Sequence, residues 1–148
     1  MDTIQRFIQC SGYPDEPQKA DGGRTSLLID GAAIEAQQLP DGGLRISCQL
    51  DRPASFPNDQ EFLALALRLA FPRMLKDNCS LAWEPDAAKL LLWTQFQPAE
   101  DDDEFLAQWE ELLNARDWWL RELDRNAPAP AQEDSASPLS TPMLFFRP

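Results

Sequence analysis

The strand pattern of residues 44–50 restricts the possible folds of this chain more than any other feature of the sequence. In Leu44-Arg45-Ile46-Ser47-Cys48-Gln49-Leu50, apolar and polar side chains alternate without a break. A strand of this kind buries one face and leaves the other in water, as strands of antiparallel sheets do. Pro40-Asp41-Gly42-Gly43, just before it, is a turn sequence. With strands over 25–30 and 33–38, the sequence predicts a three-stranded antiparallel meander.

Two helices are predicted on either side of this meander. Residues 2–10 form a short amphipathic helix with apolar side chains three and four residues apart, and Gly12, Pro14 and Pro17 predict a loop over 11–24. A second helix begins at Asn58 or Asp59 and runs to about Lys76, and Pro72 should kink or shorten it. This helix is apolar almost all round, so one sheet face cannot cover it and a second partner surface is needed.

Two strands and a long helix complete the folded part. The strands cover 81–84 and 89–96, and the helix covers about 101–124. In the strand 89–96, one face carries Leu90, Leu92 and Phe96 and the other carries Leu91 and Trp93, so both faces need cover. The sequence predicts an α+β fold, helix-β-β-β-helix-β-β-helix, with helices packed on an antiparallel sheet.

Residues 126–148 differ in composition from the predicted domain, 1–125. Five of these 23 residues are proline, which predicts a flexible, disordered tail that forms no core. The tail nevertheless contains the apolar cluster Met143-Leu144-Phe145-Phe146, followed by Arg147 and Pro148. This cluster is either a docking motif or a segment that packs on the domain, and the sequence leaves both alternatives open.

The charge of the chain excludes several classes of function. Against 25 acidic side chains there are 13 basic ones and no histidine, a formal net charge of −12. Such a balance argues against binding to nucleic acid or to anionic membranes. Without imidazole there is no Ser-His-Asp hydrolysis and no histidine ligand for zinc. No spacing singles out a catalytic carboxylate pair, so we expect neither an enzyme nor a bound metal or cofactor.

Cysteine usage and hydropathy indicate the compartment. The three cysteines, Cys10, Cys48 and Cys79, are odd in number and far apart, which is typical of reduced thiols. The sequence has no secretory signal and no apolar run near the roughly 20 residues that a membrane span needs. We therefore expect a cytoplasmic protein.

The predicted order of elements resembles that of the class I type III secretion chaperones, the Tir-chaperone-like family. The resemblance covers about residues 1–124 and lies in order and pattern more than in a strict signature. The segments that carry it are Leu27-Leu28-Ile29-Asp30, Leu44-Arg45-Ile46, Leu63-Ala64-Leu65-Ala66-Leu67, Met74-Leu75-Lys76-Asp77-Asn78, Leu106-Ala107-Gln108-Trp109 and Trp118-Trp119-Leu120.

The resemblance implies a homodimer in the bacterial cytoplasm that binds the N-terminal region of a secreted virulence effector. The effector segment would stay non-globular and secretion-competent, and the complex would meet the secretion ATPase or another apparatus component. The surplus apolar surface suggests six residues for the dimer interface, namely Leu63, Leu67, Leu81, Trp83, Leu91 and Trp93. The candidates for effector binding rest mainly on the analogy with the family. They are Ile4, Phe7, Ile8, Leu27 and Ile29.

The sequence leaves two alternative functions open. One is a regulatory or anti-activator module on the same fold, whose partner is a transcription or secretion regulator. The other is a hydrolase or transferase that uses carboxylates alone, which would require a clustered acid pair with perturbed pKa values in a pocket.

Overall fold

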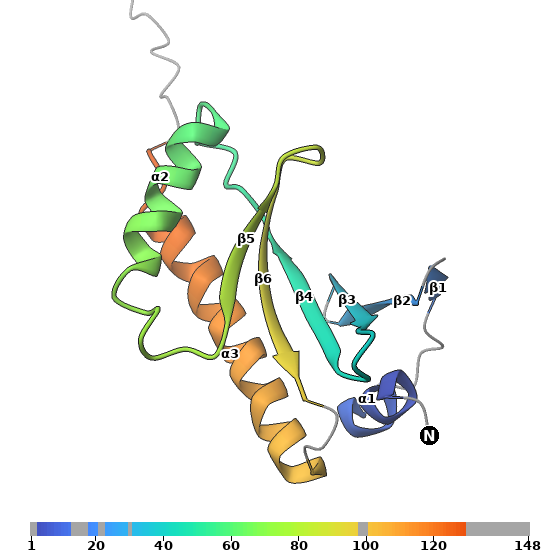
Figure 1. The fold of residues 1–148 in the computed structure, drawn as a ribbon. Coiled ribbons are helices and arrows are strands. Elements are labelled where there is room, and N and C mark those ends of the chain that lie inside the picture. The colour runs from blue at the N-terminus through green and yellow to red at the C-terminus, as the bar shows by residue number, and fades with distance from the viewer. Residues whose placement is uncertain (1–2, 13–17, 21–22, 30, 98–100, 130–148) are drawn as a thin grey trace, which may run out of the picture.

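A computed structural model describes residues 3–12, 18–20, 23–29, 31–97 and 101–129. Within these ranges three helices and six strands follow one another along the chain (Figure 1). They are α1 (Thr3–Ser11), β1 (Gln18–Ala20), β2 (Arg24–Ile29), β3 (Ala32–Gln38), β4 (Leu44–Leu50), α2 (Asp59–Ala70), β5 (Ser80–Glu84), β6 (Lys89–Phe96) and α3 (Asp102–Arg125). The strands form one antiparallel sheet in the order β1-β2-β3-β4-β6-β5. The predicted α+β architecture is confirmed.

Most predicted boundaries agree with the structure to within about one residue. The exceptions are the loop over 11–24 and the end of the second helix. The strands over 44–50 and 89–96 have the predicted bounds. The loop prediction over 11–24 is wrong at β1, which pairs with β2, because three residues are too few to show a periodic pattern. Residues 13–17 and 21–22 of that loop, and residues 130–148 of the Pro-rich tail, lie outside the described residues.

The second helix is capped and shortened as expected. The Asn58 side chain accepts a hydrogen bond from the backbone N–H of Glu61 at 2.9 Å, which satisfies one of the free donors of the first turn. The helix ends at Ala70, because Pro72 lacks an N–H and its ring crowds the preceding turn. Helix-like turns continue beyond it, with the Met74 N–H donating to the Ala70 carbonyl at 2.9 Å.

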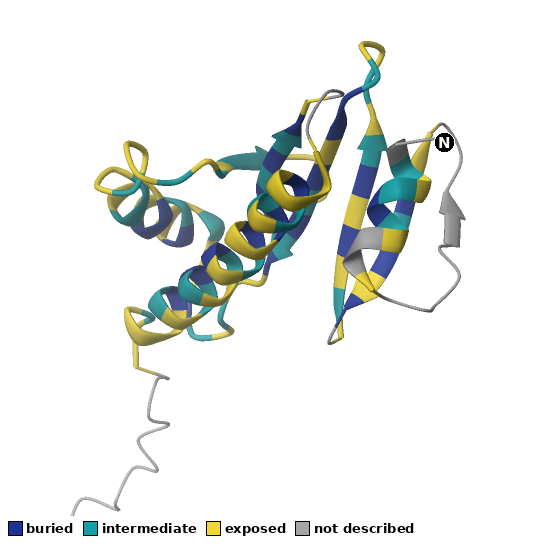
Figure 2. Ribbon diagram, turned by 90° about the horizontal axis from the view of Figure 1, so that it is seen from below, coloured by how far each residue is buried: buried dark blue, intermediate teal, exposed yellow. Residues whose placement is uncertain are grey.

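The pairing of β4 with β6 brings together the core sides of two strands that are distant in sequence. The register runs from Leu44 opposite Phe96 to Leu50 opposite Leu90. Every second side chain of both strands is buried on this side, as the alternation predicts. Figure 2 shows the buried positions of α1 and α3 on the same side of the sheet. On α3 they are Phe105, Trp109, Leu112, Ala115, Trp119 and Leu123.

The short helix α1 is fixed by one aromatic side chain. Phe7 is fully buried, and its ring meets the rings of Phe105 and Trp109 edge-on, with centroids 5.8 and 5.0 Å apart. At its solvent side, the Arg6 Nε donates to the Asp102 Oδ1 at 2.6 Å. A helix of nine residues is too short to be stable alone, so these contacts with α3 hold it in place.

We therefore expect Phe7→Ala to lower the free energy of unfolding by about 3–5 kcal/mol, as buried aromatic truncations do. Urea unfolding followed by circular dichroism measures the change. Gln5→Ala, at an exposed position on the same helix, is the matched control and should stay within about 0.5 kcal/mol of the parent. An equally small effect of Phe7→Ala would show that α1 is not fixed by this contact.

Candidate functional site

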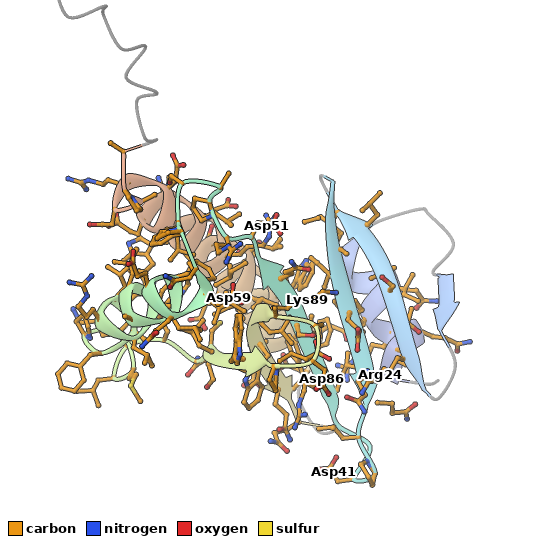
Figure 3. The ribbon with its side chains drawn as sticks, turned by 90° about the horizontal axis from the view of Figure 1, so that it is seen from above. Arg24, Asp41, Asp51, Asp59, Asp86 and Lys89 are labelled. Atoms are coloured by element: carbon orange, nitrogen blue, oxygen red, sulfur yellow. The ribbon has the colours of Figure 1, made fainter. Side chains whose placement is uncertain are left out.

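The face of the sheet that points away from α1 and α3 carries a groove of about 400 Å³. Its lining combines charged, small polar and apolar side chains from β2, β3, β4 and β6, among them Arg24, Glu35, Arg45, Ser47, Leu91 and Trp93. Arg24 and Lys89, labelled in Figure 3, belong to this lining and come from strands at its two sides. The sequence prediction that Leu91 and Trp93 face away from Leu90 and Leu92 is confirmed.

The charged groups of this open-face groove are arranged around its apolar side chains. The Arg45 guanidinium lies over the Trp93 ring, 5.0 Å from its centroid, and Arg24 pairs with Glu35 at 3.4 Å. Both interactions are solvent-accessible and contribute about 1 kcal/mol or less. The groove therefore offers a ligand an aromatic ring and a leucine side chain, with charged groups that can rearrange at little cost.

A second surface lies at the end of α2. We call the side chains of Leu67, Phe71, Met74 and Leu75 the α2 patch; they are 69, 80, 72 and 96% exposed. Among the described residues they are four of the five exposed large apolar side chains; the fifth is Leu28 on β2. A cavity of about 250 Å³ adjoins the patch and reaches Leu81, Leu92 and Trp119. Apolar side chains gathered in this way are typical of an interaction site.

The structure divides the predicted dimer-interface residues between two sides of the β5–β6 hairpin. Leu67 and Leu81 line the cavity beside the α2 patch, whereas Leu91 and Trp93 lie in the open-face groove. Leu63 and Trp83 are partly buried and pack against the core of their own chain, and Trp83 also lines the open-face groove. A single flat partner surface cannot reach all six, but a partner placed along the edge strand β5 can approach both sides.

The predicted effector-binding residues lie on the helix-covered side of the sheet. Phe7, Leu27 and Ile29 are buried, while Ile4 and Ile8 are partly buried and pack against the same core. In this conformation Ile4 and Ile8 are thus the members of the set that keep accessible surface. Their role in binding stays a prediction.

The sequence patterns do not single out four residues of these surfaces: Phe71, Met74, Leu75 and Arg45. The first three belong to the predicted helix that is apolar almost all round, and the break at Pro72 is the signal that could have marked them as exposed. Arg45 was placed correctly on the polar side of its strand. Its position beside Trp93 follows only from the β4–β6 pairing, which alternation within one strand does not reveal.

The side chains of two cysteines, Cys48 and Cys79, are described, and burial governs their chemistry. In the ranges that the structure describes, no three His, Cys, Asp or Glu side chains gather where a metal ion could sit. Burial raises the pKa of the Cys48 thiol to about 12 and that of the Cys79 thiol to about 11. Both groups are therefore protonated near neutral pH, which makes them poor nucleophiles and poor ligands. No helix in the described part of the chain is long and apolar enough to cross a membrane.

No family model and no curated protein matches this sequence, but solved structures match its fold. The HopA1–SchA chaperone–effector complex contains a chain 16% identical, with a TM-score of 0.57 over 78% of this chain and 88% of that one. A chain of the heterodimeric ExoU–SpcU complex, from the type III secretion system of Pseudomonas aeruginosa, is 19% identical (TM-score 0.55, 84% and 98% covered). An uncharacterized protein from Methanothermobacter thermautotrophicus is 9% identical (TM-score 0.60, 85% and 97% covered).

The chain therefore has the fold of type III secretion chaperones, and the resemblance inferred from the order of elements is confirmed at that level. Sequence identities below 20% support the common architecture alone. What the chain binds has to be argued from its own surfaces.

The raised thiol pKa values lead to a direct chemical prediction. At about pH 8, iodoacetamide should modify Cys79 about a hundredfold more slowly in the folded protein than in urea, and Cys48 more slowly still, because less thiolate is present. Peptide mass spectrometry resolves the two sites. Raising the pH to about 10 should speed both reactions, since deprotonation then begins. Rapid labelling of Cys48 at pH 8 would contradict the buried position.

Proposed function

We propose that this chain is a cytoplasmic type III secretion chaperone. It binds the N-terminal chaperone-binding region of one cognate effector and keeps that region non-globular and ready for secretion. The observation that carries the proposal is the open-face groove, in which Leu91 and Trp93 are held accessible on a sheet whose other face is filled by its own helices. The fold shared with a chaperone–effector complex supports it.

The sheet offers two physical means of holding an extended segment. Apolar side chains of the segment can enter the open-face groove or pack at the flank of α1 beside Ile4 and Ile8. Its backbone can pair with an edge strand such as β5, whose outer N–H and C=O groups have no strand partner among the described residues. Both modes oppose compaction of the segment, and neither requires a cofactor or a chemical step.

We further propose that the chaperone acts as a homodimer and that the loaded complex contacts the secretion ATPase or another apparatus component. The surplus apolar surface beside β5 supports the dimer, because Leu67, Leu81, Leu91 and Trp93 remain accessible there in the single chain. A stable interface buries on the order of 1,200–2,000 Å² in total. A second copy placed along β5 would cover part of Leu91 and Trp93, so the effector segment shares the open-face groove with it.

Coexpression with candidate effectors from neighbouring genes tests the main proposal. The effector's N-terminal region should copurify as two copies of this chain with one effector segment. Ser47→Glu, opposite Trp93 in the groove, should weaken binding about tenfold or more, because it places a charged and longer side chain where apolar side chains of the segment would enter. Gln60→Glu, exposed on α2, is the matched control and should bind normally.

Two results would contradict the proposal. One is a chain that ignores the N-terminal regions of all type III effectors of its host. The other is recovery of a transcription or secretion regulator in their place, which would favour the regulatory alternative.

The dimer is tested separately by light scattering. Leu67→Asp and Trp93→Asp should each convert the dimer to monomer or to aggregate, because either places a charge inside the interface. Leu28→Asp changes an equally exposed leucine outside the predicted interface and should leave the mass unchanged. If all three variants keep the parent mass, the interface lies elsewhere.

A further inference from the structure

The α2 patch gathers four of the five exposed large apolar side chains among the described residues, and the chain itself contains an apolar segment that could cover it. Leu67, Phe71, Met74 and Leu75 lie within nine residues and are each more than two-thirds exposed. Met143-Leu144-Phe145-Phe146 is the one apolar cluster of the Pro-rich tail. We propose that this tail segment docks on the α2 patch of its own chain.

The first argument is where the tail leaves the domain. α3 ends at Arg125, and the residues after it lie beside α2: Asn126 and Pro128 share a pocket with Glu61, Ala64 and Arg68. Glu61, Ala64 and Arg68 are spaced by three and four residues, so they share one face of the helix. Phe71 and Leu75 continue the same spacing through the turns after Ala70. We call this row of residues, from Glu61 to Leu75, the stripe. The tail starts near one end of the stripe, and the α2 patch lies at its other end.

The second argument is length. From Glu61 to Ala70 the helix spans about 14 Å at the helical rise of about 1.5 Å per residue, and the turns after it lead on to Leu75. Met143 lies fourteen positions after Ala129. A flexible chain of that length has a root-mean-square span of about 20 Å, and a fully extended one reaches about 46 Å. The tail cluster can thus reach the patch without strain, at an effective concentration on the order of a millimolar.

The third argument is charge. Between positions 68 and 76 the chain carries three basic side chains and no acidic one, although the whole chain has a net charge of −12. Arg68 and Lys76 are exposed, and Arg73 is partly buried against Asp77 and the ring of Trp118. The tail has its two acidic residues, Glu133 and Asp134, between the domain and the cluster. If the tail follows the stripe, these two carboxylates pass close to the Arg68 side chain. The attraction between them favours this path over one along the acidic α3.

Docking has a consequence for self-association. Leu67 belongs both to the α2 patch and to the proposed dimer interface, so a docked tail and a second copy exclude one another there. The tail then raises the concentration at which the chain dimerises. This consequence rests on the proposed dimer, whereas the docking itself needs neither a second copy nor an effector.

Photo-crosslinking of the full chain tests the docking. With benzoylphenylalanine in place of Phe146, irradiation at low micromolar concentration should give a product of monomer size, crosslinked within residues 67–76. The double change Phe71→Ser and Leu75→Ser should reduce this product at least fivefold. Leu28→Ser, at an exposed leucine on β2, is the matched control and should leave it unchanged. Crosslinks in the open-face groove, or spread over the domain, would overturn the proposal.

The size of the crosslinked product separates the two possible occupants. Crosslinks to residues 67–76 found only in a product of dimer size would mean that a second copy's tail occupies the patch, which contradicts docking within one chain. A second measurement does not depend on crosslinking chemistry. The double change Phe145→Ser and Phe146→Ser should at least double the fluorescence of a bound hydrophobic dye, because it uncovers the patch. Leu139→Ser, in the tail outside the cluster, should not, and equal fluorescence of both variants would contradict the docking.

Discussion

The pairing of β4 with β6 is the interaction on which the rest of this structure depends. It joins the meander of the first half of the chain to the β5–β6 hairpin of the second half, with α2 in the connection between them. The joined strands form the continuous apolar surface on which α3 lies, and α3 in turn holds α1 through Phe7. The pairing also needs Gly43, where a Cβ atom would stand 2.9 Å from the Phe96 carbonyl oxygen. The turn after β3 can approach β6 because this position has no side chain.

Sequence patterns gave the elements of this fold more reliably than their spatial relations. Strict alternation fixed the bounds and faces of β4 and β6, and proline chemistry explained the end of α2. The strand order and the edge strand β1 could not be obtained in this way, since alternation states which face is buried and not which neighbour it pairs with. The prediction of the candidate site has the same limit, because the pattern of one strand does not show what packs against it or how completely helices cover it. Leu27 and Ile29, predicted to bind an effector, are buried in this conformation.

The surface of the domain is divided by charge. Ten acidic and two basic residues between 97 and 124 give the last helix and its approach a net charge of −8, two-thirds of the total. The end of α2 is basic and apolar by contrast, and the open-face groove contains charges of both signs. This separation keeps the acidic helix in solvent while the accessible apolar side chains are collected elsewhere. A protein that works by contact alone gains selectivity from such a division, since an acidic partner is repelled from one side and accepted on the other.

The position of Trp93 has an optical consequence. Trp109 and Trp119 are buried and Trp118 is stacked with Arg73, so three of the five indole rings sit in surroundings set by the chain itself. Trp83 packs against the core and also lines the open-face groove. Trp93 lies in that groove beneath the Arg45 guanidinium group. Its emission spectrum therefore depends on what occupies the groove, and the protein contains an intrinsic fluorescent reporter at the place where its ligand is proposed to bind.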